Sequence, residues 1–294
     1  EVLKTKLLTG YRNITASGDK LEEIYLNRNN LGEIDLSRCN NLKILGLGDD
    51  QLIDDIRVNK NIMFIRLLGE WLRCTSEYEF EDWKNLLLTD KLFAGSKVRK
   101  IVLKNSKKTD KVPTEFASGC LNLQEIEISG TYKSIGVYAF ENCNRLTKIV
   151  IGPDVEEIQT GAFRVNNRKP SAVKIVNGLE NLKIISDFAF TNTLVGQDNI
   201  EFNRIEKIGK CAFEKLFKNV VLPNTCRIVG SNGIGAIESI VLSDRLTDRS
   251  IKNIMEWHLP KRIICNSRQA EFIRTYDNGK LDKYYDLEPR LIIK

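Results

Sequence analysis

Few side chains of this 294-residue chain stand at spacings that catalysis requires. The single histidine, His258, follows Glu256 and Trp257 and could serve as a general base. Because no serine or cysteine nucleophile motif accompanies it, a place in a structural cap beside an anchoring tryptophan explains it better. The sequence therefore predicts no catalytic residues and a protein that is not an enzyme.

Two loops have the composition of ligand-binding loops. Residues 230–235 are rich in glycine like a phosphate-binding loop, but the Gly-Lys-Ser/Thr ending is missing, so a degenerate repeat turn is favoured. Four aspartates could offer oxygen ligands to calcium: Asp49, Asp50, Asp54 and Asp55. Their spacing matches no known calcium loop, and Asp50 also fits a repeat position described below. We expect neither a metal ion nor a cofactor.

The seven cysteines include no Cys-x-x-Cys pair, which argues against both a zinc site and a disulfide framework. Cys120 and Cys143 each precede a repeat leucine by three residues and should be neighbours in adjacent coils. A disulfide could span that distance, but buried free thiols acting as small apolar groups are the favoured interpretation.

Charge is spread along the chain, with a net value of +6 from 45 basic and 39 acidic residues, and nucleic acid is not indicated as a partner. One run is denser: Lys97, Arg99, Lys100, Lys104, Lys107, Lys108 and Lys111. A solvated strand and loop explains this run, and the alternative is a site for an anionic glycan or an acidic protein. No apolar run approaches the length of a membrane span. Since the first residue is Glu1, we expect that a leader or tag was removed and that membrane attachment needs an anchor outside this chain.

The repeats indicate which elements hold the chain together. Ile-x-x-x-Ala-Phe begins at Ile135, Ile158, Ile185 and Ile208, at intervals of 23, 27 and 23 residues. Between these copies lies a second apolar pattern in which alternate residues face inward, as in Ile149-x-Ile151, typical of a strand with one buried face. Such strands pair most simply with the strand of the next coil. We predict a solenoid in which the phenylalanines stack as a ladder and each alanine marks a close approach of the backbone.

The first seventy residues follow a related rule. Leu21, Ile24, Leu26, Asn29 and Leu31 fit the leucine-rich repeat pattern, and two further copies place Asp50 and Glu70 at the asparagine position. Residues 74–97 break this rhythm and are predicted to form a helical connector. The predicted organisation is therefore leucine-rich repeats over 1–73, the connector, a second repeat array over 98–249, and a last coil with a C-terminal cap over 250–294. A helix is expected from Ser250 to Trp257.

The pattern from Ile135 to Ile151, Ile-Gly-x-x-Ala-Phe-x-x-Cys-x-x-Leu-x-x-Ile-x-Ile with one residue of slack, resembles the BspA-like leucine-rich repeats of bacterial surface proteins. The resemblance covers roughly residues 98–294 and implies a right-handed α/β-type solenoid, mainly of parallel β-structure, with a curved sheet. It also implies a secreted or surface-anchored protein used in adhesion, with no catalytic residues. The turn at 230–235 departs from the pattern, which predicts a looser coil there.

The sequence thus predicts a non-enzymatic extracellular or cell-surface binding protein that recognises its partner through a concave repeat face. The expected contacts are the outward residues of the strands: Tyr25, Gly46 and Arg66 in the first array, and Glu127, Val150, Lys174, Glu201, Val221 and Val241 in one column of the second. The partner would be a protein, such as a host extracellular protein, or an anionic glycan, and the chain is expected to be a monomer. The alternative is a structural spacer with no ligand of its own.

Overall fold

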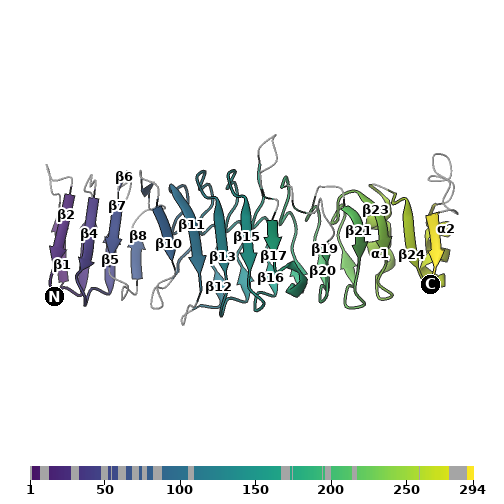
Figure 1. Ribbon diagram of the computed structural model, residues 1–294, viewed down its shortest axis with the longest axis horizontal. Coiled ribbons are helices and arrows are strands. Elements are labelled where there is room, and N and C mark those ends of the chain that lie inside the picture. Colours follow the sequence, from purple (N-terminus) through teal and green to yellow (C-terminus); the bar gives the residue numbers. More distant parts are fainter. Residues whose placement is uncertain are drawn as a thin grey trace.

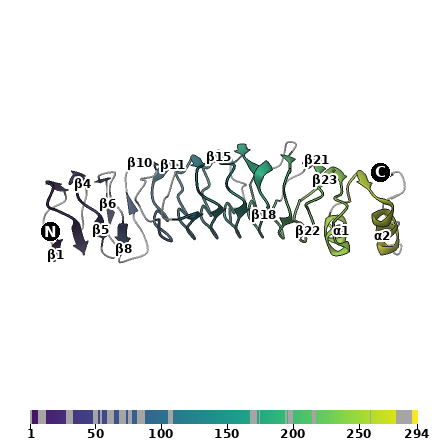
Figure 2. The same ribbon diagram turned by 90° about the horizontal axis from the view of Figure 1, so that it is seen from below.

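The chain forms one elongated solenoid in the computed structural model, with the N- and C-termini at opposite ends of its long axis (Figure 1). Its coils follow one another in sequence order along an axis that is close to straight in both views (Figures 1 and 2). The elongated repeat fold predicted from the sequence is confirmed. The structure describes residues 2–6, 13–27, 33–47, 52–53, 55–58, 64–67, 73–74, 78–81, 88–104, 109–166, 173, 175–193, 195, 200–213, 217–257, 259–277 and 290–294.

The leucine-rich coils at the start of the chain build a parallel sheet, which we call the N-terminal sheet. Its strands, in order, are β1 (Val2–Lys6), β3 (Glu23–Asn27), β5 (Ile44–Leu47) and β8 (Phe64–Leu67). The predicted repeat positions pair in register, with Leu26 opposite Leu47 and Leu47 opposite Leu67. The return segments pair as well: β2 (Asn13–Ser17), β4 (Glu33–Arg38) and β7 (Asp55–Val58) form one sheet, and β6 (Leu52–Ile53) pairs with β9 (Arg73–Cys74).

The Ile-x-Ile segments of the second array form two further parallel sheets. The middle sheet consists of β10 (Tyr78–Glu81), β11 (Val98–Leu103), β13 (Glu125–Ile128), β15 (Lys148–Ile151) and β17 (Ile175–Asn177). The C-terminal sheet consists of β19 (Ile200–Glu201), β21 (Phe217–Val221), β23 (Ile237–Val241), β24 (Arg262–Cys265) and β25 (Leu291–Ile293). Ile126 lies opposite Ile149, and Ile240 lies opposite Ile263, all fully buried. Each coil therefore places an equivalent aliphatic side chain in the core.

A second layer closes the other side of that core. It begins with a sheet of two-residue strands: β12 (Lys111–Val112), β14 (Ser134–Ile135), β16 (Glu157–Ile158), β18 (Ile184–Ile185), β20 (Lys207–Ile208) and β22 (Ile228–Val229). A 3₁₀ turn, η1 (Leu179–Asn181), precedes β18. Figure 2 shows β11, β15, β21 and β23 on one side and β18 and β22 on the other, with α1 (Asp248–Met255) and α2 (Ser267–Asp277) continuing that second side.

The predicted phenylalanine ladder runs through the core. The rings of Phe140, Phe163, Phe190 and Phe213 stack at centroid distances of 5.2 to 5.4 Å and within 9° of parallel. The ladder extends backwards to Phe116, but this contact is edge-to-face, at 85°. The order of the two residues is reversed in this coil, because Phe116 precedes Ala117, whereas alanine precedes phenylalanine in the later coils. The amide of Ala117 therefore donates the hydrogen bond to the next coil that the amide of phenylalanine donates in those coils.

Alanine before each stacked phenylalanine is fully buried, as its predicted role at a close approach requires. The turn at 230–235 keeps the same geometry with other residues. Gly233 takes the alanine position, where a Cβ atom would lie 2.7 Å from the carbonyl oxygen of Gly209, and the buried Ile234 takes the phenylalanine position by bridging to Phe213. The degenerate repeat turn is confirmed, and its tight packing replaces the looser coil that we expected.

The helical connector predicted over 74–97 is wrong for the residues that the structure describes there. Tyr78–Glu81 forms β10 and pairs with β11 in parallel, because tyrosine and phenylalanine alternate with glutamates at period 2. Residues 88–97 contain turns, and Phe93 packs edge-to-face on Phe116 at 5.3 Å. This segment begins the second array instead of separating the two arrays. Three positions of the proposed helical pattern, Trp83, Leu86 and Leu87, lie outside the described residues.

The predicted helix near residue 250 is confirmed as α1, which begins two residues earlier than expected. Thr247 is its N-cap and accepts a hydrogen bond from the amide of Ser250. Helix α2 was not predicted. A capping box begins it, because Asn266 and Gln269 exchange hydrogen bonds between side chain and amide in both directions.

Candidate functional site: the outer rows of the parallel sheets

Each parallel sheet presents an outward row, which we define as the residues between the buried positions on each strand. In the N-terminal sheet the row runs Lys4, Tyr25, Gly46, Arg66, so the three predicted positions of this array do lie in register. The Tyr25 ring occupies the space that a side chain at Gly46 would need, and its hydroxyl donates to Glu23 at 3.1 Å. Tyr25 is therefore held in place.

The outward row of the middle sheet runs, by register, Glu81, Val102, Glu127, Val150, Asn177, and Val102 in this row is buried. Glu127 and Val150 are half-buried neighbours, as predicted. Lys174 is not in this row: β17 pairs so that Asn177 lies opposite Val150 and Val176 opposite Ile149, which is a correction to the predicted column. Lys174 itself lies outside the described residues. The apolar run Ile175-Val176 allowed a slip of register, and such a slip moves a strand's residues to other rows.

The outward row of the C-terminal sheet runs Glu201, Val221, Val241, Ile264, Ile292. The predicted positions Glu201, Val221 and Val241 are in register. Four consecutive strands thus carry aliphatic residues in this row, and Val221 is 51% exposed and Ile292 38% exposed. Ile264 and Ile292 are not among the predicted contacts, although the alternation in Ile263-Ile264-Cys265 indicates an outward position for the former. We call these four side chains the aliphatic row.

The predicted column of six residues is divided between two sheets. Among the described strands, β17 ends the middle sheet and β19 begins the C-terminal sheet, and the two strands do not pair. Glu127 and Val150 therefore belong to one row, and Glu201, Val221 and Val241 to another. A partner that touches the aliphatic row meets a surface distinct from that of the middle sheet.

The charges beside the two rows also differ. In the middle sheet, the neighbouring outward positions alternate Lys100, Glu125, Lys148, with Lys100 and Glu125 paired at 3.7 Å. In the C-terminal sheet, Lys218 and Arg262 are exposed and pair with no carboxylate among the described residues.

Two ion pairs frame the aliphatic row. Lys261 pairs with Glu238 at 3.1 Å on the side where the strands begin. Where they end, Lys294 pairs with Asp244 at 3.1 Å, and its hydrogen bond holds the pKa of the Asp244 carboxyl below its usual value. Lys218 and Arg262, which pair with no carboxylate in the part of the chain that the structure describes, lie on the side where the strands begin.

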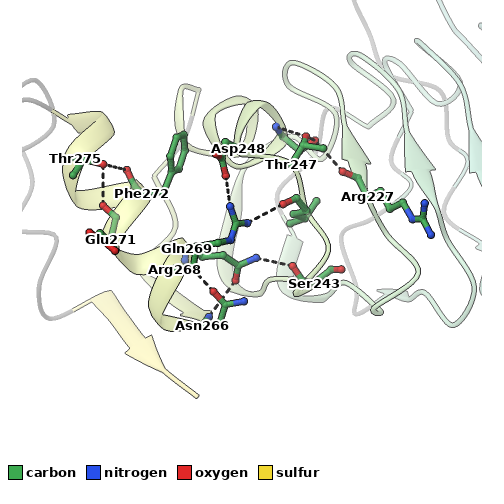
Figure 3. Close-up of polar contacts among 12 residues, drawn as sticks. Arg227, Ser243, Thr247, Asp248, Asn266, Arg268, Gln269, Glu271, Phe272 and Thr275 are labelled. Atoms are coloured by element: carbon green, nitrogen blue, oxygen red, sulfur yellow. Dashed lines mark hydrogen bonds and ion pairs between the residues drawn. The ribbon is translucent and has the colours of Figure 1, made fainter.

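The cap holds the C-terminal sheet from behind through polar contacts (Figure 3). Gln269 is fully buried and donates to the carbonyl of Ser243 at 2.7 Å. Arg268 pairs with Asp248 at 2.6 Å and also donates to the carbonyl of Leu246. These contacts fix helices α1 and α2 to each other and to the loop that follows β23. They therefore stabilise the sheet that carries the aliphatic row.

The six cysteines whose side chains the structure describes are free thiols, and among them Cys120 and Cys143 are buried, as favoured by the sequence. Cys120 donates to the carbonyl of Phe93 at 2.9 Å, and Cys143 to that of Ala117 at 3.3 Å. Burial raises the pKa of Cys120 to about 11 and that of Cys226 to about 12, and it raises the pKa of Cys143 strongly. These thiols remain protonated and unreactive at neutral pH.

The other candidate groups contribute less. In the basic run, Lys97, Arg99, Lys100, Lys104 and Lys111 are described and lie on or beside β11 and β12, whereas Lys107 and Lys108 lie outside the described residues. His258, Asp49, Asp50 and Asp54 also lie outside them, as does the side chain of Asp55. Within the described part of the chain, no cluster of three or more potential metal ligands occurs. None of the helices described is long and apolar enough to cross a bilayer.

The family comparison agrees with this architecture. The model of the BspA type leucine rich repeat region matches six copies over residues 87–216 and 183–255. Among solved structures, the chain is similar to a leucine rich cell surface protein from Faecalibacterium prausnitzii A2-165, at 11% identity and a TM-score of 0.23, over 86% of this chain and 82% of that one. No curated protein matches the sequence. Since the family model covers more than half of the chain, this protein belongs to the BspA-type leucine-rich repeat family.

Proposed function

We propose that this chain is a non-enzymatic recognition module of a secreted or cell-surface protein and that it binds a protein through the outward face of its C-terminal sheet. The observation that carries the proposal is the aliphatic row, in which Val221, Val241, Ile264 and Ile292 follow one another without a polar interruption. Membership of a repeat family that is generally non-enzymatic supports the same conclusion.

An outward valine does not by itself indicate binding, because β-branched residues favour strands. The equivalent row of the middle sheet shows what the fold accepts at these positions, since Glu127 and Asn177 alternate there with valine. Val221 and Ile292 are exposed at the two ends of the row, and Val241 and Ile264 lie half-buried between them. Exposed apolar surface of this kind is typical of sites of protein interaction. Glu201 begins the same row and is a secondary member of the proposed surface. Tyr25, Arg66, Glu127 and Val150 belong to the rows of the other two sheets and lie outside it.

The test is capture from a mixture of host extracellular proteins, with bound proteins identified by mass spectrometry. The parent chain is compared with Val221→Asp/Val241→Asp and with the matched control Val150→Asp in the middle sheet. A protein that the parent and the control retain and the double variant loses is the expected result. Equal retention by all three would move the site elsewhere, for example to the basic run at 97–111. Retention of nothing by any of them would favour a structural spacer.

A further inference from the structure

The aliphatic row also specifies the kind of element that can lie on it. We infer that the row receives an amphipathic α-helix with an acidic flank, which crosses the strands of the C-terminal sheet. This inference rests on the proposed function, since it uses the same face of the sheet. Its grounds are the spacing of the row and the charges beside it.

Neighbouring strands lie about 4.8 Å apart, so the four side chains from Val221 to Ile292 span three intervals, or about 14 Å. An α-helix laid across the strands brings one turn to the row every ~5.4 Å, and its mismatch over three intervals is about 2 Å. A β-strand presents side chains on one face every ~6.7 Å, which accumulates a mismatch of about 6 Å, more than a whole interval. A polyproline II segment repeats every ~9 Å and meets the row still less often. Of the three conformations, only the helix has a repeat close enough to the strand spacing to contact all four side chains of the aliphatic row.

The helix that fits this row carries apolar residues at i, i+4, i+7 and i+11, one for each of the four strands. Such a helix needs about three turns of continuous structure, which is an ordinary length for a globular protein. A sheet row flanked by polar strand ends is also suited to a helix because the aliphatic contacts remain confined to one stripe. Asn219 and Ser239 lie in register beside Val221 and Val241, and they supply such a polar boundary.

The charged residues beside the aliphatic row determine how the bound helix is oriented. Lys218 and Arg262 are exposed on the side where the strands begin, and neither pairs with a carboxylate among the described residues. On the opposite side, the charge of Lys294 is matched by Asp244 at 3.1 Å. The edge where the strands begin thus carries two exposed cations that no described carboxylate matches. Complementarity calls for glutamate or aspartate on one flank of the helix, and these charges set orientation and association rate more than affinity.

The aliphatic row is also rigid, so that binding requires little ordering of this surface. Its strands pair in unbroken register from β21 to β25, and the cap behind them is tied down through Gln269 and Arg268. A row held on a rigid support presents all four side chains at once, which is the condition for a helix to use them together.

The probe is a synthetic peptide of about 18 residues, with leucine at i, i+4, i+7 and i+11 and glutamate on one flank, labelled for fluorescence anisotropy. A second peptide has the same composition with leucine at every second residue, and a third replaces each glutamate of the first by lysine. We expect the helical acidic peptide to bind at least ~10-fold more tightly than either control peptide. Equal or tighter binding of the alternating peptide would overturn the inference, as would absence of binding by the helical one.

Variants of the protein locate the contact. Val221→Asp/Val241→Asp should weaken binding of the helical peptide by about tenfold or more, and Val221→Thr/Val241→Thr provides a milder change that keeps β-branching if the first variant folds poorly. Lys218→Glu/Arg262→Glu should slow association and reduce its dependence on salt. Val150→Asp should leave the affinity unchanged, and loss of binding in that control would contradict the site. If a host protein is captured through Val221 while the helical peptide fails to bind, the helix is refuted and the proposed function stands.

Discussion

The middle and C-terminal sheets are built by the same inward rule and differ in their outward rows. Ile126 and Ile149 in the one, and Ile240 and Ile263 in the other, occupy equivalent buried positions. One residue further along each strand, the middle sheet carries Val102, Glu127, Val150 and Asn177, whereas the C-terminal sheet carries Val221, Val241, Ile264 and Ile292. The fold constrains the inward row in both sheets, so the difference in the outward row is where selection for a partner would act.

The largest effect should come from the inward residues, in both regions. Replacing Phe163 or Phe190 by alanine removes a ring that stacks on both sides in the core and should lower the free energy of unfolding by about 3–5 kcal/mol. Ile240→Ala should cost about 2–5 kcal/mol in the C-terminal sheet. Urea unfolding followed by circular dichroism measures these values. Variants that unfold at the urea concentration of the parent would show that these rings are not the core.

The second prediction concerns local unfolding of the middle array and of the C-terminal coils, which thiol labelling can compare. Cys120 and Cys143 lie in the core of the middle array, and Cys226 and Cys265 in that of the C-terminal coils. We expect all four thiols to react with a disulfide reagent at pH 8 at least ~100-fold more slowly in the native protein than in urea, because burial raises their pKa and local opening must precede reaction. The half-buried Cys211 serves as the internal reference. Fast labelling of only Cys226 and Cys265 would show that the C-terminal coils open independently.

The third effect tests the outward rows. Val221→Asp/Val241→Asp should reduce the affinity for a captured protein by about tenfold, which corresponds to about 1.4 kcal/mol. Its free energy of unfolding should change less than that of the core variants, because Val221 is half exposed. Val150→Asp, at the equivalent position of the middle sheet, should retain the parent's affinity in the same titration. A loss of affinity in Val150→Asp alone would reverse the assignment of the two faces.

The inward rows could be predicted from the sequence because equivalent positions in successive coils have the same buried environment and therefore carry similar residues. The strands, the ring ladder and the close approach at alanine all follow from residues such as Ile149, Ala162 and Phe163, whose environment is the same in every coil. The turn at Gly233-Ile234 was recognised as a repeat turn, although its packing was underestimated. A glycine satisfies the close approach even better than alanine does, and isoleucine fills the space of the ring.

The register of β17 could not be read from its apolar pattern alone, because Ile175 and Val176 both suit a buried position. The spacing held the missing signal. The step from Ile158 to Ile185 in the second layer is 27 residues, and the step from Ile149 to Val176 in the middle sheet is also 27. The four extra residues lie before β17, so they lengthen both steps and move Lys174 off the outward row. Tyr78–Glu81 was missed for another reason, since a short aromatic and acidic alternation was absorbed into an apparent helix.

The smallest effect concerns the ion pair between Asp244 and Lys294, which links the end of β25 to the loop after β23. The hydrogen bond from Lys294 lowers the pKa of Asp244 in the folded state. A carboxyl with a depressed folded pKa stabilises the fold above its unfolded pKa, near 3.9, and loses that contribution as the pH falls through the folded value. Because both side chains are largely exposed, the contribution should be less than about 1 kcal/mol. Asp244→Asn should therefore show a slightly shallower loss of stability than the parent between pH 5 and pH 2 in urea unfolding. Asp154→Asn, which removes an exposed carboxylate paired with Lys133 at 3.6 Å, is the matched control. An identical pH profile in the parent and Asp244→Asn would show that this ion pair does not contribute to the stability of the fold.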